Sequence, residues 1–155
     1  MKQLIVIFLI TFFAGGQVSA QHGNMNTEKR KEIKEKQKQF IINKLQLTEK
    51  EKRDFIPVYE KYTSEREKLY IEKHKAMRNF KQNSLNMSDD ELLNLSDKFI
   101  NIELKSAQLC KKYNEQFKKV LPPVKIILLY QAENEFKKQL IKKMHHKQVN
   151  KKKMP

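Results

Sequence analysis

The sequence predicts an all-α protein built from four helices in hairpins. Glycine occurs only three times in 155 residues, which leaves little material for the tight turns of β-hairpins. Apolar residues recur at steps of three and four over most of the chain, as on one face of a helix. Two helix-start signals and a pair of adjacent prolines divide the chain into helices at about 28–45, 49–82, 88–121 and 123–144.

The first twenty residues are typical of a secretory signal peptide. A basic Lys2 precedes an apolar run, and the small residues of Val18-Ser19-Ala20 favour cleavage after Ala20. A retained membrane anchor is the alternative, but the run is short for a bilayer span. We therefore expect an exported, periplasmic protein.

The remaining chain is predicted to hold one helical domain at 28–144. A flexible N-terminus at 21–27 would precede it, and a basic disordered tail at 145–155 would follow. Without its signal peptide the chain has 32 cations and 18 acids, a net charge of +14. Eight lysines and no acid lie between positions 136 and 155. Such charge favours an anionic partner such as a membrane surface or an acidic polypeptide, and export argues against nucleic acid. The alternative is a solvated surface that serves solubility.

The first helix, at 28–45, is highly charged and gains an apolar stripe only toward its end. The second helix begins at a predicted capping box, in which the side chain of Thr48 bonds to the amide of Glu51 and the side chain of Glu51 bonds back to the amide of Thr48. Leu47, just before the cap, is placed to act as a hydrophobic staple. Pro57 should bend this long helix because it removes one backbone donor. Its predicted apolar face contains Phe55, Tyr59, Tyr62, Leu69, Ala76 and Phe80.

The third helix begins at a second capping box, Ser88 with Glu91. "MSDDE" at 87–91 echoes "LTEKE" at 47–51, which indicates either duplicated hairpins or the ordinary recurrence of helix caps. The apolar face of this helix is the most regular in the chain: Leu92, Leu95, Phe99, Ile102, Ser106, Leu109, Tyr113, Phe117 and Val120.

Pro122 and Pro123 precede the apolar run "VKIILLY". A strand there would have no partner strand, and Lys125 makes the run too short to span a membrane. Proline is tolerated in the first turn of a helix, so these residues predict an almost loopless break between two helices. The first two turns of the fourth helix are apolar nearly all round, which predicts burial against more than one neighbour. Its inner face is predicted to hold Ile126, Leu129, Tyr130, Glu133, Phe136, Leu140 and Met144.

Catalysis and cofactor binding have little support. The sequence has no Ser/His/Asp arrangement and no nucleotide-binding glycine loop. Cys110 is the single cysteine, and its place beside Leu109 predicts an inert core thiol, with an intermolecular disulfide as the alternative. His145 and His146 are weak metal candidates, because adjacent histidines on a helix point about 100° apart. We expect no enzyme, no cofactor and no specific metal site.

One stripe of the second helix is a candidate surface for a partner or client. Tyr59 and Tyr62, interrupted by Arg66 and Lys73, would suit an adaptable amphipathic surface for a protein partner or an unfolded client. Core packing is the alternative for the two tyrosines. Many long amphipathic faces on a small elongated chain also predict a homodimer.

"LQLTEKEKRDFIPVYEKY" and "YNEQFKKVLPPVKIILLYQAENEFKKQL" together resemble the Spy/CpxP-like family of exported helical proteins. Its L-T-x-x-Q motif corresponds to Leu47-Thr48-Glu49-Lys50-Glu51 here, with Glu51 in place of glutamine. The chain is most similar to the branch described as periplasmic sensors linked to ECF-type sigma factors or heavy metals.

This resemblance implies a concave helical dimer and a non-catalytic role. The closer branch implies an envelope-stress sensor or adaptor that acts with ECF-type sigma factor signalling. The wider family implies an ATP-independent chaperone that binds unfolded polypeptides, and the tail histidines leave a metal-binding sensor as a further alternative.

Overall fold

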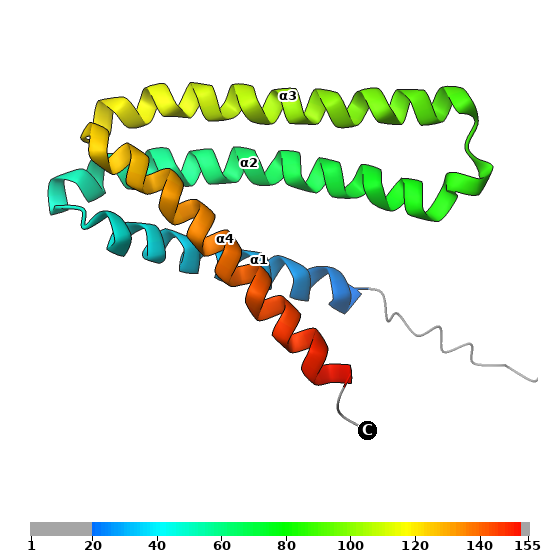
Figure 1. The fold of residues 1–155 in the computed structure, drawn as a ribbon, viewed down its shortest axis with the longest axis horizontal. Helices are drawn as coiled ribbons and strands as arrows, with labels where there is room; N and C mark the ends of the chain where they lie inside the picture. The colour runs from blue at the N-terminus through cyan, green and yellow to red at the C-terminus, as the bar shows by residue number, and fades with distance from the viewer. Residues whose placement is uncertain (1–19, 153–155) are drawn as a thin grey trace, which may run out of the picture. The chain divides into compact units, whose positions relative to one another are not determined.

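The computed structural model describes residues 20–152, with side chains at 28–143 and at His145. Figure 1 shows the helices in chain order. They are α1 (Ala20–Leu45), α2 (Glu49–Asn83), the short 3-10 helix η1 (Ser84–Asn86), α3 (Asp89–Val120) and α4 (Pro123–Lys152). Four α-helices and no strand in the described residues confirm the all-α prediction.

The inner helix ends agree with the predicted ones to within one residue, but the outer ends do not. α1 begins at Ala20 and α4 continues to Lys152, so the expected flexible segment at 21–27 and the expected disordered tail are helical up to residue 152. No proline interrupts either extension, and the C-terminal extension at 145–152 contains three lysines and a glutamine, which are good helix formers. The predicted signal peptide lies outside the described residues except for Ala20.

α2 and α3 form an antiparallel hairpin joined by η1 (Figure 1). Both helices begin at the predicted capping boxes, and α2 continues through Pro57 as one helix. The predicted inner face of α3 is confirmed: Leu95, Ile102, Leu109, Tyr113 and Phe117 are buried, and the other four residues are half-buried.

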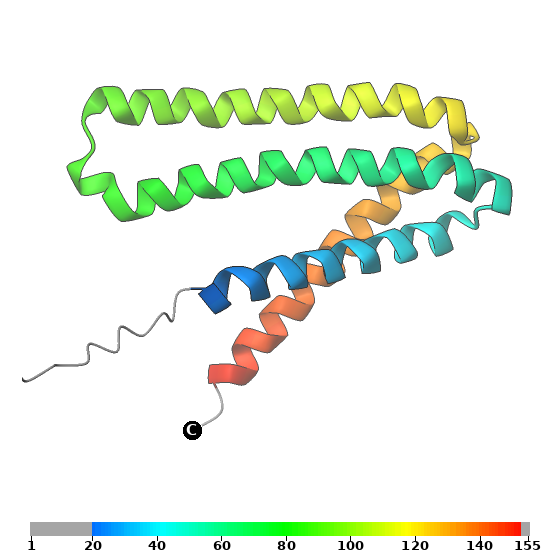
Figure 2. The same cartoon turned by 180° about the vertical axis from the view of Figure 1, so that it is seen from behind.

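The hydrophobic core lies at the end of the hairpin that is far from η1. The segment of α1 after Ile33 packs there beside α2, and Figure 2 shows α2 between this segment and α3. Aromatic rings from α2 and α3 fill the centre, where Phe117 contacts the rings of Phe55 and Tyr62 at centroid distances of 5.7 and 5.6 Å. The buried core cluster contains Ile41, Ile42, Leu45, Leu47, Phe55, Tyr59, Tyr62, Leu109, Tyr113, Phe117, Leu121, Ile126, Leu129 and Ala132.

The adjacent prolines separate α3 from α4 as predicted. Leu121 is extended, with φ −131° and ψ 144°, and α4 begins at Pro123. The first turns of α4 pack in a core cluster with residues of α1, α2 and α3, but only on one side of the helix. Ile126 and Leu129 are buried, but Val124 and Ile127 are 65% and 61% exposed, because the core covers only one side of this helix.

Among the described residues, no helix combines the length and apolar character needed to cross a membrane.

Candidate functional site

The motif residues at the two helix starts are helix caps. Thr48 accepts a hydrogen bond at Oγ1 from the Glu51 amide at 3.3 Å, and the Thr48 amide donates to Glu51 Oε2 at 2.8 Å. Ser88 and Glu91 repeat this reciprocal pair at 3.3 and 2.9 Å. Each box satisfies amides that a helix N-terminus leaves without partners. Leu47, the predicted staple, is buried in the core.

Glu51 differs from Glu91 by a contact to α4. Lys125 donates to Glu51 Oε2 at 2.6 Å and to the carbonyl of Gln46 at 3.0 Å. Gln46 lies in the α1–α2 turn with φ 47°, the left-handed region. The hydrogen bond from Lys125, followed by that from the Thr48 amide, lowers the pKa of the Glu51 carboxyl.

This contact joins the two stretches that carry the family resemblance. Lys125 follows Pro122 and Pro123 in the first turn of α4, and the carbonyl of Pro122 accepts the Lys125 amide at 2.9 Å. A glutamine in place of Glu51 could keep the reciprocal cap but would lose the charge opposite Lys125. The motif residues Leu47, Thr48, Glu51, Pro122 and Pro123 therefore organise the junction between helices.

The predicted partner surface on α2 is wrong for its two tyrosines. Tyr59 and Tyr62 are 1% and 2% exposed and belong to the core. Arg66 is half-buried against α4, and Lys73 is exposed and pairs with Glu103 of α3. These four residues follow one stripe of α2, but α4 covers its first part.

A buried polar network lies where α4 crosses this stripe. Glu133, whose side chain is 9% exposed, accepts from Arg66 Nη1 at 3.2 and 3.1 Å and from the Tyr59 hydroxyl at 3.2 Å. Arg66 also donates to the Tyr62 hydroxyl at 3.0 Å. Burial, and then the charge of Glu133, raises the pKa of Tyr59. Each polar group of this network forms a hydrogen bond with another member. This is typical of an ion pair that stabilises a fold.

Cys110 lies at the edge of this network and is exposed, which corrects the predicted core thiol. Its Sγ is 3.5 Å from the Tyr62 hydroxyl. Leu109, one residue earlier, is buried. One residue turns a helix by about 100°, which is enough to move Cys110 from the core to its rim.

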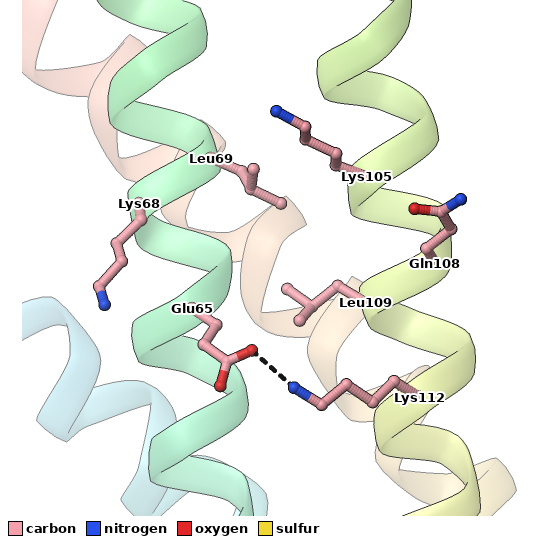
Figure 3. A pocket seen from close by; sticks show the side chains of 7 residues that line it. All are labelled: Glu65, Lys68, Leu69, Lys105, Gln108, Leu109 and Lys112. Atoms are coloured by element: carbon pink, nitrogen blue, oxygen red, sulfur yellow. Dashed lines mark hydrogen bonds and ion pairs between the residues drawn. The ribbon is translucent and has the colours of Figure 1, made fainter.

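An open groove lies between α2 and α3 on the side of the hairpin that faces away from α4. Figure 3 shows Leu69 and Leu109 pointing toward each other from the two helices, with α4 behind them. The groove has a volume of about 520 Å³. We call it the α2–α3 groove; it is lined by Glu65, Lys68, Leu69, Lys105, Gln108, Leu109 and Lys112.

An ion pair between Glu65 of α2 and Lys112 of α3 crosses one end of the groove (Figure 3). Lys112 donates to Glu65 at 3.1 Å, and the Tyr113 hydroxyl donates to the same carboxylate at 2.7 Å. These bonds, that from Tyr113 first, lower the pKa of Glu65, and burial with the Glu65 bond raises the pKa of Tyr113 to about 12. Within the described residues, Lys68 and Lys105 have no acidic partner. Figure 3 shows Lys105 extending toward the space between the helices and Lys68 pointing away from it, so the groove offers two apolar side chains and one available ammonium group.

The described side chains form no cluster of metal ligands around the histidines. Among these side chains, no group of three or more His, Cys, Asp or Glu residues could hold an ion. His145 is exposed, the side chain of His146 lies outside the described residues, and His74 packs on the Tyr70 ring at 4.2 Å.

Comparison of the chain with family models, curated proteins and solved structures finds no match.

Proposed function

We propose that this protein is a non-catalytic, exported sensor or adaptor that binds a polypeptide partner through the α2–α3 groove. The groove is the observation that supports the proposal. The Spy/CpxP-like resemblance further suggests that the protein acts in a periplasmic stress response coupled to ECF-type sigma factor signalling.

The chemistry of the groove suits a short acidic segment with aliphatic side chains. Leu69 and Leu109 can contact one apolar side chain, while Lys105 can pair with a carboxylate beside it. Small-molecule sites are usually more enclosed, whereas an open groove between helices can accept an extended or helical peptide. The net charge of +14 that remains without the signal peptide would also accelerate encounter with an acidic partner at low salt.

Fluorescence anisotropy with two labelled peptides tests the proposal. One peptide alternates leucine with glutamate, and the other alternates leucine with lysine. We expect the acidic peptide alone to bind, and Lys105→Glu to weaken binding about tenfold through one reversed charge contact. Lys138→Glu on α4 is the matched control, because it changes the net charge equally at an exposed position outside the groove. Equal loss in both variants would indicate non-specific attraction and would contradict a groove site.

A chaperone role is the second candidate function. It is favoured by the exposed apolar side chains on the half of the α2–α3 hairpin that lies beyond α4. Tyr70, Met77 and Phe80 on α2 are 38–55% exposed, and Leu85 at the hairpin turn is fully exposed. Such residues could hold apolar segments of unfolded clients. Light scattering from an aggregating client separates the two roles. Suppression at stoichiometric amounts supports the chaperone, whereas peptide binding without suppression supports the sensor or adaptor.

A further inference from the structure

One side of α4 faces away from the core and carries a row of exposed side chains. Lys138 follows the buried Leu129 by nine residues, so at 100° per residue the two point in opposite directions. The row extends over about 30 Å at 1.5 Å per residue, and its members lie within about 60° of one another around the helix. We call it the α4 outer face; its members, all exposed, are Val124, Ile127, Gln131, Lys138, Lys142 and His145.

α4 is the outermost helix on its side of the hairpin. Figure 1 shows α4 in front of α2, and Figure 2, seen from behind, shows α2 in front of α4. The inner side of α4 contacts α2 through Glu133, which bonds to Tyr59 and Arg66. Among the described residues, no helix covers the α4 outer face, since Val124 and Ile127 are 65% and 61% exposed.

The α4 outer face is apolar at its start and cationic toward its end. Leu128, 38% exposed, widens the apolar part beside Ile127. From residue 136 to its end at 152, α4 contains seven lysines and no acid. The two acids of α4 lie before this segment, where Glu133 is buried with Arg66 and Glu135 pairs with Lys44 of α1 at 3.0 Å.

This distribution of charge selects the occupant of the face. A second copy of α4 would bring lysines against lysines or against apolar side chains, with no unpaired acid among the described residues of the helix to offset them. A peptide would meet the ridge of a single helix, whereas the α2–α3 groove has a wall on each side. An anionic lipid surface offers phosphate groups and an apolar layer side by side, and lysine stems can reach from one to the other.

We propose that the α4 outer face docks on a surface of anionic lipid, with α4 lying flat on it. Val124, Ile127 and Leu128 would enter the boundary between headgroups and acyl chains. Lys138 and Lys142 would pair with lipid phosphates farther along the same face.

Docking through α4 would direct the α2–α3 groove away from the lipid. The groove opens on the side of the hairpin that faces away from α4, as Figure 3 shows with α4 behind the groove residues. A partner in the groove and a lipid surface would therefore not compete for the same side chains. The lipid contact proposed here does not depend on the function proposed above.

Sedimentation with lipid vesicles tests the contact in the exported chain, without its signal peptide. The vesicles contain phosphatidylcholine, either alone or mixed equally with phosphatidylglycerol, in about 100 mM salt. We expect binding to the anionic vesicles that is about tenfold or more tighter than binding to the neutral ones. Absence of binding to either vesicle, or equal binding to both, would overturn the proposal.

Lys138→Glu should weaken binding to the anionic vesicles about tenfold or more, because one cation at the surface accounts for about fivefold and the variant reverses it. Lys75→Glu is the matched control with the same change in net charge. Lys75 is exposed on α2 and follows Arg66 by nine residues, about 180° around the helix, on the side opposite α4. A charge there is separated from the lipid by two helix layers and is screened, so binding should stay within about twofold. Equal losses in the two variants would indicate non-specific attraction and would contradict docking through α4.

Tryptophan fluorescence tests whether the apolar part enters the lipid, since the chain has no tryptophan of its own. We expect the emission of Ile127→Trp to move to shorter wavelength with anionic vesicles and to be quenched by brominated acyl chains. Ser64→Trp is the control, because Ser64 is exposed on α2 about 160° around the helix from Arg66, and its emission should not change. The same response from both variants, or none from Ile127→Trp, would overturn the proposal.

The acidic leucine–glutamate peptide separates a lipid occupant from a polypeptide. A shift of Ile127→Trp emission with the peptide but not with vesicles would assign the α4 outer face to a polypeptide and would overturn lipid docking. Lys138→Glu should lose vesicle binding and keep the peptide affinity of the wild type. The lipid contact and the groove site can therefore fail separately.

Discussion

Replacing Arg66 by methionine tests whether the polar network holds α4 on the hairpin. The guanidinium donates to both oxygens of Glu133, whose side chain is 9% exposed. Among the described residues, the only other bond to that carboxylate comes from Tyr59. Methionine retains much of the stem of arginine and removes the charge. Glu133 would then be a buried anion with one hydroxyl donor.

The expected loss follows from the unequal exposure of the two partners. Removing one partner of a buried ion pair costs about 3–5 kcal/mol, and the 41% exposure of Arg66 places the loss near 3 kcal/mol. Glu133→Leu should cost only about 1–2 kcal/mol, because Arg66 can reach water and only the Tyr59 hydroxyl loses its acceptor. The double variant should lose about 1–2 kcal/mol as well, since its buried charge is gone.

Urea unfolding at pH 7, followed by circular dichroism, measures the three free energies. Lys73→Met is the matched control on the same stripe of α2. Its partner Glu103 is 58% exposed, so the loss should lie within about 1 kcal/mol. A loss below about 1 kcal/mol for Arg66→Met, or additive losses in the double variant, would refute the claim that the network holds α4 on the hairpin.

Three further predictions concern single side chains. Glu51→Gln should lower the free energy of unfolding at pH 7 and leave it nearly unchanged below pH 3, by urea unfolding. The lowered pKa of Glu51 gives stability that is present above its ordinary pKa of 4.5 and lost as the pH falls; a pH-independent difference would contradict the Lys125 contact. Phe117→Ala should cost about 3–5 kcal/mol, because Phe117 is 1% exposed among aromatic rings; a loss below 1 kcal/mol would place it outside the core. Cys110 should react with a thiol reagent in the native state, and protection until unfolding would contradict its exposure.

Local sequence signals predicted the inner ends of the helices to within one residue. Both capping boxes form as expected, since their hydrogen bonds join residues only three apart. The inner face of α3 was predictable for a similar reason, because a regular stripe of steps three and four has one consistent burial direction. Leu121 before Pro122 was likewise restricted by its immediate neighbour.

Contacts between distant residues were not predictable from these signals. The Lys125–Glu51 and Arg66–Glu133 pairs join residues 74 and 67 positions apart. A signal for the second pair was present, because Glu133 falls on the predicted inner face of α4, where an acid needs a partner. For Tyr59 and Tyr62 the sequence left a partner surface and core packing both open, because nothing in the sequence of α2 states how far α4 covers this stripe.

The placement of α4 separates the residues that build the fold from those that remain available to a partner. The motif residues on both sides of the Lys125–Glu51 contact already form caps, turns and ion pairs between helices. The half of the hairpin beyond α4 contributes few residues to the core, yet it holds most of the exposed large apolar side chains of α2 and α3. Variants in the motif should therefore change stability first, and binding only through unfolding. Variants in the α2–α3 groove should change the affinity for a partner while the unfolding midpoint stays constant. A groove variant that lowers the affinity and the unfolding midpoint in proportion would contradict this division.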